Sequence, residues 1–151
     1  MTTTESRSAW SAQPWHTHER DEPEWLDRAA CLALLDPSGI GRVAITMRAL
    51  PLIIPVGYVR AGDDVVFGAS ADHRLDAALR NSVIAFETDT VDGARGTAWS
   101  VCMTGRADPV DDDDILALAR RIPPWPPGAA APERLVRIRS ELVVGQLRRS
   151  A

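Results

Sequence analysis

Lysine is missing from this sequence: all 17 of its basic side chains are arginine. Without a lysine amine, the chain cannot form a Schiff base with pyridoxal phosphate, and it cannot build the lysine-containing phosphate loop of nucleotide hydrolases. Two large classes of enzyme are therefore excluded before any pattern along the chain is considered.

Metal-binding and disulfide-forming residues are scarce as well. The chain has two cysteines, Cys31 and Cys102, which are far apart and form no C-x-x-C pair, and its histidines are His16, His18 and His73. This spacing does not match a structural zinc site, and the first two histidines lie in a polar stretch without periodicity. We expect no bound metal, and we expect both cysteines to be reduced, buried thiols.

Long apolar runs and an excess of positive charge are also absent. The longest apolar stretch, Leu50 to Val59, is too short to cross a bilayer, and Met1 to Pro14 lack the apolar core of a secretory signal. The net charge is −4, and Asp111 to Asp114 form an acidic run. We therefore expect a cytoplasmic protein with no membrane span and no nucleic-acid partner.

The remaining composition is sufficient for one domain. The 151 residues, of which 45% are hydrophobic and 25% charged, are typical of a single soluble globular unit. Residues 1–21 are polar and aperiodic, which indicates a disordered N-terminal arm. Residues 22–151 are expected to form the folded domain.

Alternating apolar residues and turn signals indicate a chain made mostly of strands. The expected strands are 42–48, 52–59, 65–68, 83–87, 97–107 and 135–147, the last one broken near Ser140 and Glu141. The first two are expected to pair. The expected helices are 23–35, one after Asp72, and 111–121 with Ile115, Leu116, Leu118 and Ala119 facing inward. Short turns between the strands favour a six-stranded antiparallel barrel with flanking helices over a doubly wound parallel sheet.

One loop differs from the others in composition. The run Pro123-Pro124-Trp125-Pro126-Pro127 cannot continue a helix, and prolines hold such a segment extended. We expect a stiff surface loop that serves as a lid or as an arm in a dimer.

Five segments in a fixed order carry a resemblance to a known family. They are Ser38-Gly39-Ile40-Gly41-Arg42-Val43-Ala44, Ile54-Pro55-Val56-Gly57-Tyr58-Val59, Val65-Val66-Phe67-Gly68-Ala69-Ser70, Gly96-Thr97-Ala98-Trp99-Ser100-Val101 and Gly105-Arg106-Ala107. From about Trp25 to Leu147 the chain resembles the pyridoxamine 5′-phosphate oxidase-like, FMN-binding split barrels, and within them the small actinobacterial-type branch related to nitroimidazole-resistance proteins. The resemblance implies a split β-barrel and a homodimer with the flavin at its interface.

The resemblance also implies where the cofactor phosphate binds. The phosphate-binding segment of the family corresponds to Ala69 to Leu75, in which Arg74 stands where relatives commonly have lysine. The hydroxyl of Ser70, backbone N–H groups at a helix start and the guanidinium of Arg74 would together bind a phosphate group. Asp72 brings a negative charge to this site unless it caps the helix, and His73 is the candidate for an acid–base role.

The flavin ring is expected to lie against two strands. Pro55 and Val56 on one strand, and Trp99, Ser100 and Val101 on the other, match the ring-binding strands of the family. Pro55 cannot donate to a sheet ladder, so it indicates an edge or a bulge where backbone groups are free for a ligand. Trp99 has an equally good alternative role as a barrel residue that fills a gap at the dimer interface.

These features predict a flavin-dependent oxidoreductase that uses FMN, transfers hydride and acts on an unidentified small organic substrate. Relatives on the same fold use a deazaflavin or haem, and the charged tail of a deazaflavin would need extra cations, for which Arg42, Arg48 and Arg106 are the candidates. Alternatively, the domain is a non-catalytic dimeric module that binds a cofactor or a partner. Asp72, and Gly57 where relatives often have a polar residue, favour this alternative.

Overall fold

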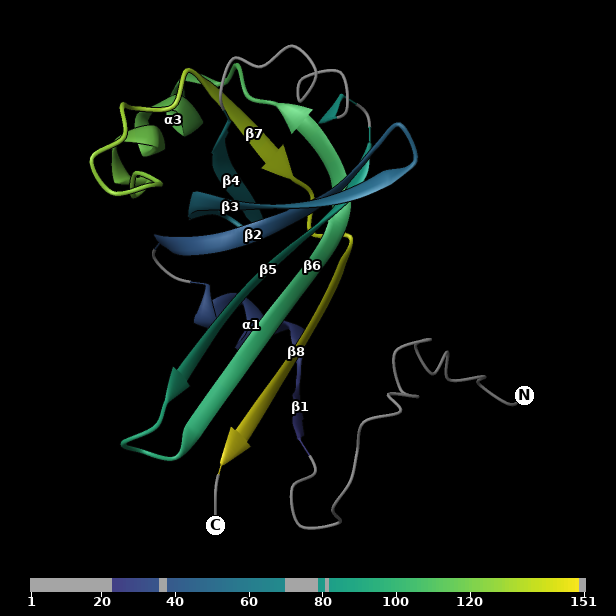
Figure 1. Cartoon of the computed structure of the whole chain (residues 1–151), viewed down its shortest axis with the longest axis vertical. Helices are drawn as coiled ribbons and strands as arrows, with labels where there is room; N and C mark the ends of the chain where they lie inside the picture. Colours follow the sequence, from purple (N-terminus) through teal and green to yellow (C-terminus); the bar gives the residue numbers. More distant parts are fainter. Residues whose placement is uncertain (1–22, 36–37, 70–78, 81, 150–151) are drawn as a thin grey trace.

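The computed structural model describes residues 23–35, 38–69, 79–80 and 82–149. In this part of the chain, eight strands form one antiparallel sheet in the order β1-β8-β6-β5-β2-β3-β4-β7 (Figure 1). The strands are β1 (Glu24–Leu26), β2 (Ser38–Met47), β3 (Leu50–Ala61), β4 (Asp64–Ala69), β5 (Val83–Asp92), β6 (Thr97–Pro109), β7 (Arg134–Ile138) and β8 (Leu142–Arg149). The described helices are α1 (Arg28–Leu34), the short α3 (Asp113–Leu116) and the 3₁₀ helix η1 (Ala117–Arg121).

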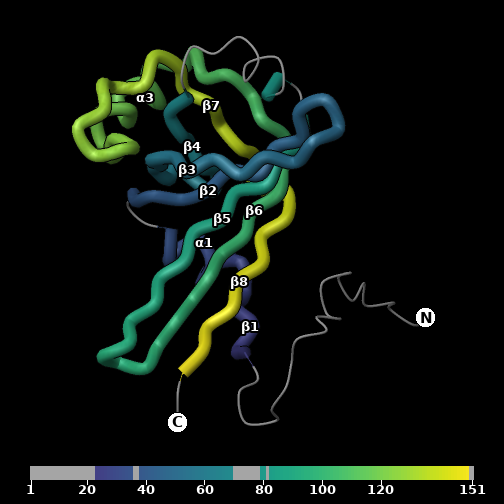
Figure 2. The backbone as a smooth tube through the Cα atoms, viewed as in Figure 1, coloured from purple at the N-terminus to yellow at the C-terminus, as the bar shows by residue number. Residues whose placement is uncertain are grey.

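Six of these strands close into a ring. β7 pairs with β4 on one side and with β6 on the other, which joins the two ends of the run β6-β5-β2-β3-β4. β8 and β1 continue outward from β6, and Figures 1 and 2 show β5, β6 and β8 running side by side away from the ring. The expected six-stranded antiparallel barrel, mainly β with few helices, is therefore confirmed.

The expected pairing of the first two long strands is also confirmed. All of β2 pairs with Leu50–Val59 of β3, up to Met47 opposite Leu50, so Arg48 and Ala49 form the turn. Both turn residues have positive φ, 51° and 64° respectively. Such a turn matches the twist of a hairpin, but it normally contains asparagine or glycine because a larger side chain crowds the backbone there. This hairpin thus forms against the preference of its turn residues.

The start of the described domain differs from the expectation. Glu24–Leu26, expected to be helical, is strand β1, and α1 begins after Asp27, whose carboxylate accepts a hydrogen bond from the amide of Ala30 at 2.8 Å. The exposed edge of β8 supplies hydrogen-bond partners to this segment, so a strand replaces the first helical turn.

The expected break in the last strand near Ser140 and Glu141 is confirmed, because β7 ends at Ile138 and β8 begins at Leu142. Near its end, β6 pairs with β7, whereas Thr97–Thr104 of the same strand pairs with β8. The chain therefore breaks between Ile138 and Leu142 because it leaves the ring there and joins the outward part of the sheet.

The expected helix over 111–121 is shorter and less regular. Asp112 caps α3, with its carboxylate accepting from the amide of Asp114 at 2.9 Å, and the helix tightens to a 3₁₀ turn from Ala117. Ile115 and Leu118 pack inward, as does Ala119, but Leu116 is 41% exposed, so its inward placement was wrong. In a 3₁₀ turn residues three apart align, which brings Ile115 and Leu118 to one side and leaves Leu116 outside.

The sheet separates two hydrophobic clusters. The larger one fills the barrel and extends under α1, with Phe67, Phe86 and Met103 among its fully buried side chains. The smaller one lies on the other side of β3, β4 and β7, where Val59 and Val66 meet the segment that follows η1. In the described residues, no helix is long and apolar enough to span a membrane.

Candidate functional site

The pairing between β3 and β4 stops before either strand ends. Their ladder runs from Ala61 opposite Asp64 to Tyr58 opposite Phe67. Beyond this point β3 still pairs with β2 and β4 still pairs with β7, but the two strands part from each other. The ring therefore opens here, and backbone groups on the facing edges are left without a strand partner in the described structure.

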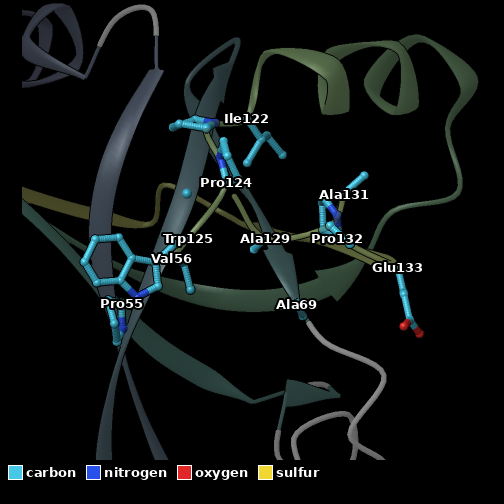
Figure 3. A pocket seen from close by; sticks show the side chains of 14 residues that line it. Pro55, Val56, Ala69, Ile122, Pro124, Trp125, Ala129, Ala131, Pro132 and Glu133 are labelled. Atoms are coloured by element: carbon cyan, nitrogen blue, oxygen red, sulfur yellow. The ribbon is translucent and has the colours of Figure 1, made fainter. Parts of the chain in front are cut away.

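A cavity of about 250 Å³ occupies this opening. Figure 3 shows its lining, which comes from the two parted strands and from the loop that follows η1. The lining residues are Pro55, Val56, Gly57, Gly68, Ala69, Ile122, Pro123, Pro124, Trp125, Ala129, Ala130, Ala131, Pro132 and Glu133. The walls are thus largely apolar, with one carboxylate among their side chains.

Two glycines allow the loop to lie directly on the strands. A Cβ atom on Gly57 would lie 1.8 Å from the carbonyl oxygen of Pro123, and one on Gly68 would lie 2.5 Å from Cβ of Pro132. Neither contact is sterically acceptable, so any side chain at these positions would displace the loop. Any residue other than glycine at position 57 is therefore incompatible with this loop position.

Three of the predicted ring- and phosphate-binding residues lie together at the cavity: Pro55, Val56 and Ala69. Pro55 is exposed, whereas Val56 and Ala69 are only 6% and 5% exposed. These two small, buried positions therefore contribute mainly backbone to the cavity.

The structure does not bring the three β6 residues to this cavity. Val101 is fully buried in the barrel core, and Trp99 packs against the same core, opposite Thr90 and Leu147. Ser100 points to the other side of the sheet, where its hydroxyl accepts a hydrogen bond from Nε2 of Gln146 at 3.3 Å. Trp99 thus packs against the core of the described chain, and its contact with a flavin or with a dimer partner stays a prediction.

The remaining predicted site residues lie outside the described part of the chain. They are Ser70, Asp72, His73 and Arg74, and the same holds for His16 and His18. Within the described ranges, no three or more side chains of His, Cys, Asp or Glu come together as a metal site would require.

Beside the cavity, one face of the sheet lacks a covering helix among the described elements. A cross-strand row of facing residues runs over five strands of this face: Ile53, Ala44, Ala85, Thr104 and Leu142. The next row consists of Pro55, Arg42, Glu87, Cys102 and Val144. We call these two rows together the open face. α1 packs against the opposite side, because Cys31 faces Gly145 there.

The open face is apolar with one ionic cluster. Ile53 is 72% exposed and Leu142 43% exposed. Arg42 pairs with Glu87 at 2.7 Å and with the neighbouring Asp89 at 3.5 Å, and its hydrogen bond to Glu87 is the largest of the effects that raise its pKa. Because Arg42 is paired with two carboxylates on the neighbouring strand, the cluster makes the open face more polar but gives it no net positive charge.

The two cysteines lie in different surroundings. Cys31 is fully buried, as expected, and burial is the main cause that raises the pKa of its thiol. Cys102 is only half-buried and belongs to the open face, so its expected core position was wrong, although burial also raises the pKa of its thiol. It belongs to the face because Cys102 pairs with Glu87 and Val144, whereas the core-facing positions of β6 are its two neighbours.

The proline run from Pro123 to Pro127 was expected to form a lid or a dimer arm, but no residue of the loop from Ile122 to Glu133 was predicted to line a binding site. A signal was present in Gly57 and Gly68, because a glycine inside a strand often marks the close approach of another segment.

Comparison with known proteins gives a consistent result. A family model described as pyridoxamine 5′-phosphate oxidase matches residues 27–146. An uncharacterized protein of Mycobacterium tuberculosis, Rv0080, is 35% identical over 126 residues, which are 80% of this chain and 82% of that protein. The structure of an FAD binding protein from Mycobacterium smegmatis is 28% identical, with a TM-score of 0.67 over 83% of this chain and 98% of that one. The structure of an FAD and haem binding protein from the same organism is similar in fold, at 17% identity and a TM-score of 0.63 over 83% of this chain and 74% of that one.

Proposed function

The chain belongs to the pyridoxamine 5′-phosphate oxidase family, and on that premise we propose that it binds a flavin and acts as a flavin-dependent oxidoreductase. FMN is the form predicted by the sequence, the substrate is a small organic molecule, and the related proteins named above that bind FAD support a flavin in general. When bound, the flavin supplies the hydride chemistry, which the side chains of the protein position and protect.

The observation that carries this proposal is the opening between β3 and β4. Its edges offer backbone N–H and C=O groups, and its walls are formed by proline, alanine and valine. A flavin ring has flat apolar faces and a polar rim of nitrogen and oxygen atoms. The apolar walls of the opening therefore match the faces of the ring, and the backbone groups at its edges match the polar rim. The residues present therefore fit the group that the family implies.

In this proposal the chain has three tasks at the cavity. The backbone from Pro55 to Gly57 binds the polar rim of the ring, and the loop from Ile122 to Glu133 excludes water from it. Beyond Ala69, the hydroxyl of Ser70 and the guanidinium of Arg74 bind the phosphate, as the resemblance implies.

We further propose that the active form is a homodimer and that the open face is its interface. Ile53 and Leu142 expose large apolar side chains there, and such a row over five strands is unusual for a surface that stays in water. Pro55 belongs both to this face and to the cavity lining. A second copy packed on the face would therefore also cover the cavity entrance and place the flavin at the interface.

The first experiment is an absorption spectrum of the protein after incubation with FMN, FAD, a deazaflavin or haem and removal of the unbound compound. Retained flavin bands near stoichiometry support the proposal. Arg74→Ala should then lose at least tenfold in FMN affinity, whereas Arg80→Ala, at an exposed position a few residues away, should not.

The alternative outcomes are equally informative. Retention of haem or of a deazaflavin instead of FMN or FAD would make the chain a relative with a different cofactor. A folded dimer that retains none of the four compounds would overturn the flavin proposal and favour the non-catalytic binding module.

A further inference from the structure

We propose that Trp125 is the aromatic wall of the cavity and that the flavin ring stacks on its indole. This inference rests on the proposed function, because it assigns a ring-binding residue to the same site. Trp125 lines the cavity together with Pro55 and Val56 of β3, and Figure 3 shows its indole among the side chains of the lining.

The exposure of this indole is the first argument. Trp125 is 47% exposed although it lies in a lined cavity instead of on a convex surface. A tryptophan side chain is among the largest apolar surfaces that a protein can bury, and half of this one has no partner in the isolated chain. A flat ligand in the cavity would cover it.

The chemistry of the cavity lining also favours an aromatic ligand. The other lining side chains are aliphatic, apart from the carboxylate of Glu133, so Trp125 offers the one π face among the fourteen lining residues. An aromatic heterocycle with an electron-poor ring interacts favourably with an electron-rich indole, in an offset-stacked or an edge-to-face arrangement. A purely aliphatic substrate would gain nothing specific from this residue.

The loop also restricts the position of the indole before a ligand binds. Two prolines precede Trp125 and two follow it, and prolines restrict the backbone on both sides. The loop is also attached to the barrel on either side of the indole, at Ile122, which is 8% exposed, and at Pro132, which lies against Gly68. Holding the indole in place therefore costs little additional entropy when a ligand binds.

The test compares the full-length wild type with Trp125→Phe, Trp125→Leu and Trp25→Leu. Trp25 is a matched control, because it is 51% exposed but lies on β1, away from the cavity lining. Each protein is titrated with FMN and FAD while the fluorescence of the flavin is recorded, since an indole in contact with a flavin ring quenches its emission.

We expect Trp125→Leu to weaken flavin binding by about threefold to tenfold, in line with the strength of aromatic stacking, and to make the bound flavin several times brighter. Trp125→Phe should keep most of the affinity but lose most of the quenching. Trp25→Leu should match the wild type in both measurements.

Two results would overturn the inference while leaving the proposed function intact. One is an unchanged affinity and an equally quenched flavin in Trp125→Leu. The other is loss of flavin together with loss of the dimer, measured by light scattering, which would make Trp125 an interface residue. If the wild type itself binds no flavin, the proposed function and this inference both fail.

Discussion

Gly145 on β8 faces the sulfur of Cys31 on α1 so closely that a Cβ atom on Gly145 would lie 2.5 Å from Sγ. This contact holds the helix against the sheet, because Cys31 is fully buried and the glycine leaves just enough room for it. A larger side chain at Gly145, or a smaller one at Cys31, should therefore change the packing of the other residue.

Gly145→Ala should lower the free energy of unfolding by about 1–3 kcal/mol, because the added methyl group overpacks this contact. Cys31→Ala removes the sulfur and should partly relieve the clash, so the double variant should be more stable than the sum of the two single effects predicts. Urea denaturation of the four proteins measures the coupling. Strict additivity would show that the cost of the added methyl group does not come from its contact with Sγ of Cys31.

Gly57→Ala should displace the loop from Ile122 to Glu133, since the new methyl group would occupy the position of the Pro123 carbonyl. We expect at least a tenfold loss of flavin affinity and a lower melting temperature. Gly93→Ala is the matched control, because nothing lies within 4 Å of the added atom there. Wild-type affinity in Gly57→Ala would mean that the loop is not part of the binding site.

Ala49→Gly should stabilise the protein by about 0.5–1 kcal/mol, because glycine adopts positive φ without the crowding that alanine meets in this turn. The same change at Ala29, on an exposed position of helix α1, should have the opposite sign, since glycine disfavours helices. Thermal denaturation of both variants decides the matter. A loss of stability in Ala49→Gly would show that the turn is not strained.

Stability should fall above about pH 9. Burial raises the pKa of Cys31 above its ordinary value of 9.0 and that of Tyr58 above 10.0, while a hydrogen bond with Thr88 opposes the second shift. Groups with a raised folded-state pKa contribute full stability below the unfolded pKa and lose it as the pH rises through the folded one. Urea denaturation from pH 7 to 11 should show this decline, and Tyr58→Phe should flatten the part above pH 10. A constant free energy of unfolding over this range would contradict the buried, neutral state of both groups.

Ile53→Glu should convert the proposed dimer to a monomer, because a charge would replace a 72% exposed apolar side chain in the open face. Leu116→Glu is the control, since Leu116 is also exposed but lies on α3, outside the open face. Light scattering at micromolar concentration measures both masses. A wild type that is itself monomeric, or a dimeric Ile53→Glu, would exclude this interface.

The central strands were predictable because their pattern is local. In β2, Val43 and Ile45 alternate with exposed residues, and this period of two is sufficient to identify a half-buried strand. The same alternation places Trp99 and Val101 on one side of β6 together with the buried Met103, so their core position was readable from the sequence.

The misplaced elements depend on distant contacts. Glu24–Leu26 is a strand because the edge of β8 lies beside it, and no local signal near Pro23 reports that neighbour. The cavity wall is a similar case, because the loop at Trp125 joins the site through close contact with Gly57 on another strand. Sequence spacing alone does not reveal which loop is placed on which glycine.

The pairing of β1 with β8 also determines when the domain can be completed during synthesis. Arg149 binds the carboxylate of Glu24 at 2.6 Å across 125 residues of chain, and the strands beside them form the outer edge of the sheet. A chain that emerges from the ribosome N-terminus first therefore presents β1 long before its partner exists. Helix α1 and the outer edge of the sheet must wait for the last strand, so the first described residues are among the last to reach their native contacts.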